Sequence, residues 1–213
     1  MTKFILSICI PTFNRAQYIE QTLKSIIPKI KKNIEIVIYD GASSDNTDEI
    51  IYQYTKKYKN IIFYKAVKNG GVDRDYANCI EMARGKYCWL MSSDDIVPPN
   101  SIEKILDSLK CNSDIYLFNR AECNKKMIPF NYQYCLKSNL ENKLFNIRSR
   151  DDLLLYFKSV KMFGGIFSYA PSIIVNRDRW LSVQGASKFY GTCYAHVYRL
   201  LIIILSGCKL KYI

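Results

Sequence analysis

The sequence predicts an α/β fold with a mostly parallel central sheet and helices on both of its faces. Apolar runs alternate four times with helical patterns through residues 1–110, which is typical of parallel strands joined by helices. Hydrophobic residues make up 49% of the 213 residues, enough to bury a full core. Polar, turn-forming residues follow all four runs, and in such sheets ligands bind beyond the carboxyl ends of the strands.

Four short apolar runs are the strands expected in the first half of the chain. Each is rich in aliphatic or aromatic residues and leads directly into polar residues. They span residues 4–10, 34–39, 61–65 and 87–91.

Helical patterns fill the segments that follow these strands, because apolar side chains recur there at helical spacing. The first helix carries Ile19, Leu23, Ile26 and Ile27 and stops near Pro28. The second is capped by Ser44 or Asp45 and carries Ile50, Ile51, Tyr54 and Tyr58. The third spans 74–84 and ends in a left-handed turn at Gly85, and the fourth carries Ile102, Ile105, Leu106 and Leu109.

The second half of the chain is less regular, and residues 119–149 are polar and aromatic without a clear period. Strands are expected at 114–118, 171–175 and 209–213, and helices at 150–160 and 195–207. We therefore divide the chain into residues 1–110 and residues 111–213, with the second half packed on the first as one compact domain.

The chain is strongly basic. Lys and Arg total 31 against 19 Asp and Glu, a net charge of +12, so an anionic partner or surrounding is expected. Nucleic acid is not an expected partner, because no recognised motif or concentrated basic stripe is present. The more specific interpretation of the charge is contact with an anionic membrane surface. The simpler one is that the basic side chains only face the solvent. No run approaches the ~20 apolar residues that span a bilayer, and eight cysteines without a C-x-x-C pair favour free thiols in a reducing cytoplasm.

Adjacent carboxylates follow the fourth predicted strand. Asp94 and Asp95 repel each other and are costly to desolvate unless a positive group lies between them. Their hard oxygen atoms suit Mg²⁺ or Mn²⁺, which share their coordination with the phosphates of a substrate. The alternative is that one of them caps the helix that begins near Pro98. Because three other polar loops are expected at the same sheet edge, we favour the metal.

Asp40 ends the second predicted strand and precedes Gly41. Its carboxylate can accept a hydrogen bond from the edge of a nucleobase, or it can belong to an ordinary Asp-Gly turn. Neither G-x-G-x-x-G after the first strand nor G-x-x-x-x-G-K-[ST] is present, so dinucleotide and Walker-type phosphate sites are not expected.

Four stretches resemble the family 2 glycosyltransferases, an inverting group with the Rossmann-like, nucleotide-sugar-binding A-type fold. They are LSICIPTFNRAQYIEQTLKSI, IEIVIYDGASSDNTDEII, NGGVDRDYANCIEMARGKYCWLMSSDD and VPPNSIEKIL, and together they cover about residues 4–110. The stretch YCWLMSSDD is similar to a branch that includes abequosyltransferase-like enzymes of surface-polysaccharide assembly.

The resemblance implies roles at matching positions. The residues implied to contact the nucleotide or the sugar are Pro11, Thr12, Arg15, Asp40, Ser43, either Asp73 or Asp75, and Asp94. Asp95 is implied to be the direct ligand of the diphosphate-bound Mg²⁺ or Mn²⁺, with Asp94 beside it. This sequence departs from the family's Asp-x-Asp motif, because Ser92 stands at its first position.

The second half of the chain lacks the Glu-Asp pair that usually supplies the general base in this family. Counted back from Gly207, the positions of the pair fall on Ala195 and His196, the only histidine. Imidazole titrates near neutrality, so His196 is the candidate catalytic base. A structural role and a role as a metal ligand with Asp95 are the alternatives. Asp151 and Asp152 are fallback bases, although they resemble the capped start of a helix.

Residues 162–172 contain paired glycines and the aromatic residues Phe163, Phe167 and Tyr169. They are expected either to form an acceptor-side loop whose rings stack on sugars or to pack in the core.

Taken together, these features predict a metal-dependent inverting glycosyltransferase. It would move a sugar from a nucleoside-diphosphate sugar to a saccharide or lipid-linked saccharide acceptor in the cytoplasm, at the inner face of the cell membrane. The alternative is a non-catalytic sugar-nucleotide or saccharide-binding module that kept the fold after losing its base. Because the chain stops within a predicted strand and many relatives carry a further tail, a C-terminal truncation is also expected.

Overall fold

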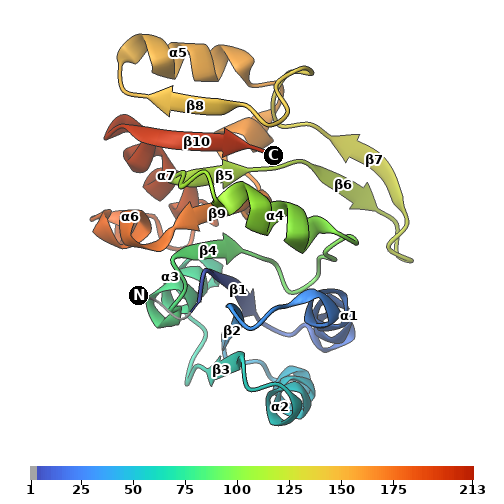
Figure 1. The fold of residues 1–213 in the computed structure, drawn as a ribbon. Helices are drawn as coiled ribbons and strands as arrows, with labels where there is room; N and C mark the ends of the chain where they lie inside the picture. Colours follow the sequence, from blue (N-terminus) through green and yellow to red (C-terminus); the bar gives the residue numbers. More distant parts are fainter. Residues whose placement is uncertain (1–3) are drawn as a thin grey trace.

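An eight-stranded sheet connects the two halves of the chain (Figure 1). The computed structural model describes residues 4–213. The strand order is β3-β2-β1-β4-β9-β5-β10-β8. The strands are β1 Leu6–Thr12, β2 Ile34–Asp40, β3 Ile61–Lys65, β4 Tyr87–Leu90, β5 Ile115–Leu117, β8 Leu144–Ile147, β9 Ile173–Asn176 and β10 Cys208–Tyr212.

The first four strands form the parallel part of the sheet. β1 lies between β2 and β4 and runs parallel to both, and β3 pairs with β2 in the same direction. β9 then runs antiparallel between β4 and β5, and β8 runs antiparallel at the far edge. The prediction of a mostly parallel sheet is therefore confirmed, with β9 as the strand that joins the two halves.

Helices cover both faces of the sheet, as predicted. On one face, α1 Ala16–Ile26, α2 Thr47–Lys57 and α4 Ser101–Leu109 bury apolar side chains against the strands. On the other face lie α3 Val72–Met82, α5 Arg150–Ser159, α6 Arg177–Ser182 and α7 Ala195–Leu205. No helix within residues 4–213 combines the length and apolar character needed to cross a membrane.

The segment 119–149 contains structure that the sequence analysis missed. β6 Arg120–Cys123 and β7 Pro129–Gln133 form a separate two-stranded ribbon, and β8 follows them. A clear signal was present in residues 130–134, where aromatic and polar side chains alternate as on a strand exposed on both faces.

α5 begins with a capping box. The Ser149 hydroxyl accepts a hydrogen bond from the Asp152 N–H, and the Asp152 carboxylate accepts one from the Ser149 N–H. The fallback base Asp152 is therefore engaged in starting a helix, as its sequence context indicated.

The prediction of a left-handed turn at Gly85 is wrong. α3 ends at Met82, and Gly85 does not have a positive φ. Glycine is needed there for close packing, because an added Cβ would lie 2.6 Å from Ser7 Oγ, 2.7 Å from Ser7 N and 2.9 Å from Leu6 C. The loop after α3 thus passes directly over β1, and the Gly85 N–H donates to Ser7 Oγ at 2.9 Å.

We expect Gly85→Ala to lower the free energy of unfolding by about 1–3 kcal/mol, because the methyl group would overlap the backbone of β1. Urea unfolding followed by the fluorescence of the buried Trp89 and Trp180 measures the change. Gly70→Ala is the matched control, since its Cβ would meet only the flexible Arg74 side chain. Equal losses of unfolding free energy in the two variants would contradict the close-packing role of Gly85.

Candidate functional site

The loops after β1, β3 and β4 meet at one edge of the sheet and enclose a pocket of about 320 Å³. Parallel strands deliver their carboxyl ends to the same edge, which explains why segments far apart in sequence converge here. The lining residues are Pro11, Thr12, Phe13, Arg15, Asn69, Gly71, Val72, Asp75, Tyr76, Ser92, Ser93 and Asp94.

Asp40 lies at the end of β2, fully buried. Its Oδ1 accepts hydrogen bonds from the Ser43 N–H at 3.0 Å and from the Ser43 hydroxyl, while its backbone carbonyl accepts one from the Ala66 N–H at 2.7 Å. Among residues 4–213, its buried Oδ2 has no hydrogen-bond partner, and neither has the buried Thr12 Oγ1. Buried polar atoms without partners are costly, so these two oxygens are acceptor positions that a ligand can satisfy.

Asp75 presents a second carboxylate to the same region. It is buried on the first turn of α3, and a Cβ added to Gly41, the residue after Asp40, would lie 2.6 Å from its Oδ2. Burial, and after it the charge of Asp40, raises the pKa of Asp75 to about 6, against a smaller lowering by Arg74. The carboxyl group is therefore partly protonated near neutral pH and can donate as well as accept a hydrogen bond.

Asp94 lies at the mouth of the pocket with Arg15. Arg15 Nε lies 3.3 Å from Asp94 Oδ2, and the Ser92 hydroxyl donates to Asp94 Oδ1. The Arg15 N–H donates to Thr47 Oγ1 at 2.9 Å, which links the loop after β1 to the start of α2. With both side chains about 40% exposed, this pair is open to solvent and to a ligand.

Asp95 points to a different partner, Tyr169. The Tyr169 hydroxyl donates to Asp95 Oδ2 at 2.6 Å, and the Arg120 guanidinium lies 3.9 Å above the Tyr169 ring. Burial raises the pKa of Asp95, while the Tyr169 hydrogen bond opposes that rise. The alternative role for the acidic pair, capping α4, is wrong, because no side chain caps that helix.

The acidic pair has the chemistry of a site for Mg²⁺ or Mn²⁺. Both groups supply hard carboxylate oxygens, and Asp95 combines burial with neutral Tyr169 as its hydrogen-bond partner. Within residues 4–213, no group of three or more His, Cys, Asp or Glu side chains is arranged to hold a metal ion. The pair therefore fits a cation that takes its other ligands from phosphate and water, and His196 does not join it as a third ligand.

Asp73 and Asp75 point to different surroundings. The Asp73 carboxylate accepts hydrogen bonds from the N–H groups of Gly191 at 2.9 Å, Cys193 at 2.8 Å and Ala195 at 3.1 Å. Of the two alternatives for bordering the nucleotide, the structure places Asp75 in the pocket lining and Asp73 against the start of α7.

His196 lies in the first turn of α7, almost fully buried. Its Nε2 lies 2.9 Å from the Phe167 carbonyl oxygen, which fixes Nε2 as the protonated nitrogen and leaves Nδ1 as the acceptor. Burial lowers the pKa of His196, so the ring is neutral at pH 7. Two residues beyond Phe167, Tyr169 holds Asp95, so the segment 167–169 links the histidine to the acidic pair.

Phe163, Phe167 and Tyr169 have three different environments. Phe163 is exposed, Phe167 is in the core, and Tyr169 bonds to Asp95. Core packing is therefore confirmed for Phe167, while stacking of the other two rings on a sugar stays a prediction.

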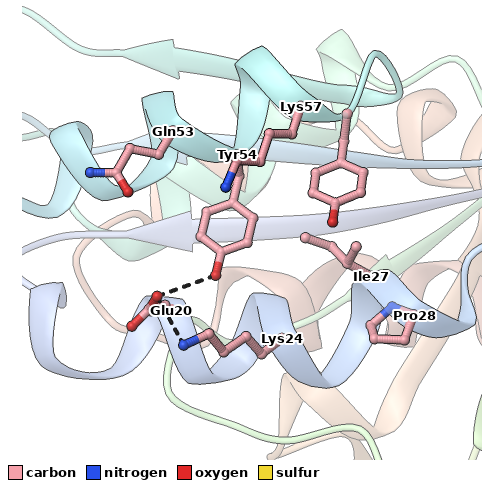
Figure 2. A pocket seen from close by; sticks show the side chains of 8 residues that line it. Glu20, Lys24, Ile27, Pro28, Gln53, Tyr54 and Lys57 are labelled. Carbon is pink, nitrogen blue, oxygen red and sulfur yellow. Dashed lines mark hydrogen bonds and ion pairs between the residues drawn. The ribbon is translucent and has the colours of Figure 1, made fainter.

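A second hollow, of about 270 Å³, lies between α1 and α2 (Figure 2). Glu20 accepts a hydrogen bond from the Tyr54 hydroxyl at 3.4 Å and pairs with Lys24 at 3.0 Å. None of the candidate site residues lines this hollow.

Comparison with known proteins identifies the family. Residues 7–173 match the profile described as Glycosyl transferase family 2. The chain belongs to glycosyl transferase family 2. It is 33% identical to the abequosyltransferase RfbV of Salmonella typhimurium over 98% of this chain and 64% of that protein.

Solved structures share the fold of this family 2 chain. It superimposes on S. aureus TarS in complex with UDP with a TM-score of 0.73 and 18% identity, over 99% of this chain and 58% of that one. The mannosyltransferase PcManGT from Pyrobaculum calidifontis, in complex with GDP-Man and Mn²⁺, gives a TM-score of 0.63 and 14% identity, over 98% and 56% of the two chains. This chain therefore spans less than two thirds of each relative.

Two further residues at the site of this family 2 chain, Arg120 and Tyr76, do not stand out in the sequence. Tyr76 lines the pocket, and its hydroxyl donates to the Met91 carbonyl at 3.2 Å. Arg120 reaches the acidic pair through Tyr169. No local pattern marks either residue, because both depend on contacts between elements far apart in sequence.

The raised pKa of Asp75 has a consequence for the stability of this family 2 chain. Because its folded pKa of about 6 lies above the ordinary value of 3.8, the folded state binds the proton more tightly than the unfolded state. Stability from this group is present below the ordinary pKa and is lost as the pH rises through 6. Asp75→Asn should therefore be more stable than wild type at pH 8, by about 1–2 kcal/mol after allowing for screening at the pocket.

The difference in unfolding free energy between Asp75→Asn and wild type should be smaller at pH 4.5 than at pH 8. Urea unfolding at the two pH values measures this difference. Asp151→Asn, at an exposed position, is the control and should shift the stability little at either pH. An Asp75→Asn variant that is less stable than wild type at pH 8 would contradict the assignment.

Proposed function

We propose that this chain forms the donor-binding and catalytic part of a metal-dependent, inverting glycosyltransferase. It would move a sugar from a nucleoside-diphosphate sugar to a saccharide or lipid-linked saccharide acceptor in surface-polysaccharide assembly. One observation carries the proposal: the buried, unpartnered oxygens of Asp40 and Thr12 lie at the same sheet edge as the acidic pair Asp94 and Asp95. The 33% identity to an abequosyltransferase supports the same reaction class.

The donor nucleotide would bind with its base toward Asp40 and its diphosphate toward the acidic pair. Asp40 Oδ2 offers an acceptor to a base N–H group, and Thr12 Oγ1 lies nearby on β1. Ser43 holds the Asp40 carboxylate in place, and Pro11 shapes the wall of the pocket. Arg15 is positioned to exchange its contact with Asp94 for a phosphate oxygen.

Asp95, assisted by Asp94, would hold Mg²⁺ or Mn²⁺. When bound, the cation would neutralise charge that develops on the leaving diphosphate. Asp95 must be ionised to act as a ligand, and the hydrogen bond from Tyr169 favours that form against the effect of burial. Tyr169 is thus proposed as a positioning residue that keeps the carboxylate both ionised and oriented.

His196 is the proposed general base. With Nε2 donating to the Phe167 carbonyl, Nδ1 is the nitrogen that would take the proton from the acceptor hydroxyl as it attacks the anomeric carbon. Its lowered pKa keeps the imidazole neutral, the form that accepts a proton. The reaction breaks the bond from the sugar to the diphosphate and forms one to the acceptor oxygen, with inversion at the anomeric centre.

Calorimetric titration with UDP, GDP, CDP and dTDP, each with Mn²⁺ and then with EDTA, tests the donor site. We expect one nucleotide to bind in a metal-dependent way, and Asp95→Asn to weaken that binding at least about tenfold. Asp151→Asn removes the same charge at an exposed position and serves as the matched control. If no nucleotide binds to the wild type, the proposed function is wrong.

His196→Gln tests the catalytic base separately from donor binding. We expect the rate of sugar transfer to fall by about 10²–10⁴-fold, the usual contribution of general base catalysis, while nucleotide affinity stays within about twofold. The wild-type rate should be constant near neutral pH and fall as the pH drops through the lowered pKa of the imidazole. Nucleotide binding without any transfer by the wild type would favour the non-catalytic binding module instead.

A further inference from the structure

The β6–β7 ribbon projects from the end of the main sheet next to β5 (Figure 1). Two backbone hydrogen bonds close its turn: the Met127 N–H donates to the Asn124 carbonyl at 2.8 Å, and the Asn124 N–H donates to the Ile128 carbonyl at 3.0 Å. At its base, the Cys135 N–H donates to Asn119 Oδ1 at 3.0 Å. The ribbon is therefore an ordered element rather than a loose loop.

One face of the ribbon is polar and internally bonded. Glu122 accepts hydrogen bonds from Asn131 Nδ2 at 3.1 Å and Gln133 Nε2 at 2.6 Å, and an Arg120 nitrogen lies 3.4 Å from Gln133 Oε1. Arg120 also stacks on Tyr169, which holds Asp95. The polar face is thus turned toward the acidic pair.

The opposite face carries three aromatic rings. Phe130, Tyr132 and Tyr134 are 67%, 64% and 44% exposed. Within residues 4–213, Phe130 and Tyr132 make no ring contact, and Lys161 Nζ lies 5.4 Å from the centre of the Tyr134 ring. Near Lys161 in sequence, Phe163 is 77% exposed. Clustered exposed apolar side chains of this kind mark an interaction surface.

Positive charge surrounds the aromatic face. Lys125 and Lys126 are exposed at the turn of the ribbon, and Lys161 lies at its base. The one acidic residue of the ribbon, Glu122, is bonded on the polar face. Two copies of the chain meeting through this face would bring their lysines together, so charge disfavours self-association.

We infer that the aromatic face of the β6–β7 ribbon, with Lys125, Lys126 and Lys161, docks on the surface of an anionic bilayer. Tyrosine and phenylalanine rings at the headgroup level bury apolar area, the tyrosine hydroxyls stay in contact with water, and lysines beside the rings bind anionic headgroups. With this face on the lipid, the polar face and Arg120 keep the acidic pair beside the membrane surface.

This inference rests on the proposed function in one respect, because a lipid-linked acceptor is what would place the enzyme at a membrane. The experiment uses sedimentation with vesicles of phosphatidylcholine mixed with phosphatidylglycerol, and with vesicles of phosphatidylcholine alone. The full chain should bind the anionic vesicles at least about tenfold more tightly than the neutral ones.

Two double variants locate the binding face. Phe130→Ser with Tyr132→Ser, and Lys125→Ala with Lys126→Ala, should each weaken binding to anionic vesicles by about tenfold or more. Tyr52→Ser with Tyr64→Ser, and Lys31→Ala with Lys32→Ala, remove exposed side chains of the same kinds elsewhere and should leave binding within about twofold. Nucleotide titration on every variant tests whether the fold and the donor site are intact. A failure of the proposed nucleotide binding is therefore distinguishable from a loss of vesicle binding.

Three results would overturn the inference. The first is the absence of vesicle binding by the wild type. The second is an equal loss of binding in the ribbon and control variants. The third is a wild-type dimer in sedimentation equilibrium that Phe130→Ser with Tyr132→Ser makes monomeric, because the aromatic face would then be an interface between two copies of the chain.

Discussion

The carboxylate of Asp73 is the contact on which the arrangement of the candidate site depends. It lies in the first turn of α3, in the first half of the chain, and accepts hydrogen bonds from three backbone N–H groups of residues 191–195 in the second half. Those residues lead into α7 and therefore set where His196 lies. A hydrogen-bonded carboxylate at the start of α7 also interacts favourably with the helix dipole. One side chain thus fixes the position of the candidate base relative to the pocket.

The site concentrates negative charge on a protein with a net charge of +12. Asp40, Asp75, Asp94 and Asp95 all lie along the same sheet edge, and Arg15 is the only cation that pairs directly with one of them among the described residues. Burial raises the pKa of both Asp75 and Asp95, and the neighbouring carboxylates of Asp40 and Asp94 raise the two pKa values further. In the proposed function, a diphosphate that carries its own cation would favour the ionised form of both carboxylates, whereas a bare anion would oppose it.

Part of the arrangement of the candidate site was predictable from the sequence. Asp40 and the acidic pair follow apolar runs closely, and parallel strands bring their carboxyl ends to one edge, so local pattern was enough to place them together. Tyr169 was noticed as an aromatic residue but not as the partner of Asp95. That contact depends on β9 inserting between β4 and β5, which no local pattern specifies. The role of Asp73 was missed for the same reason, since its partners lie more than 110 residues away.

The position of β9 also constrains the order in which the sheet can be completed. β4 pairs with β1 on one side, but its other neighbour, β9, is formed by residues 173–176, long after β4 in the chain. While the protein is being synthesised, β4 and β5 therefore each present an unpaired strand edge until that short segment has emerged. Exposed edges of this kind invite pairing with other chains. The sheet is thus most vulnerable to misassembly during synthesis at its centre, where the finished molecule is most deeply buried.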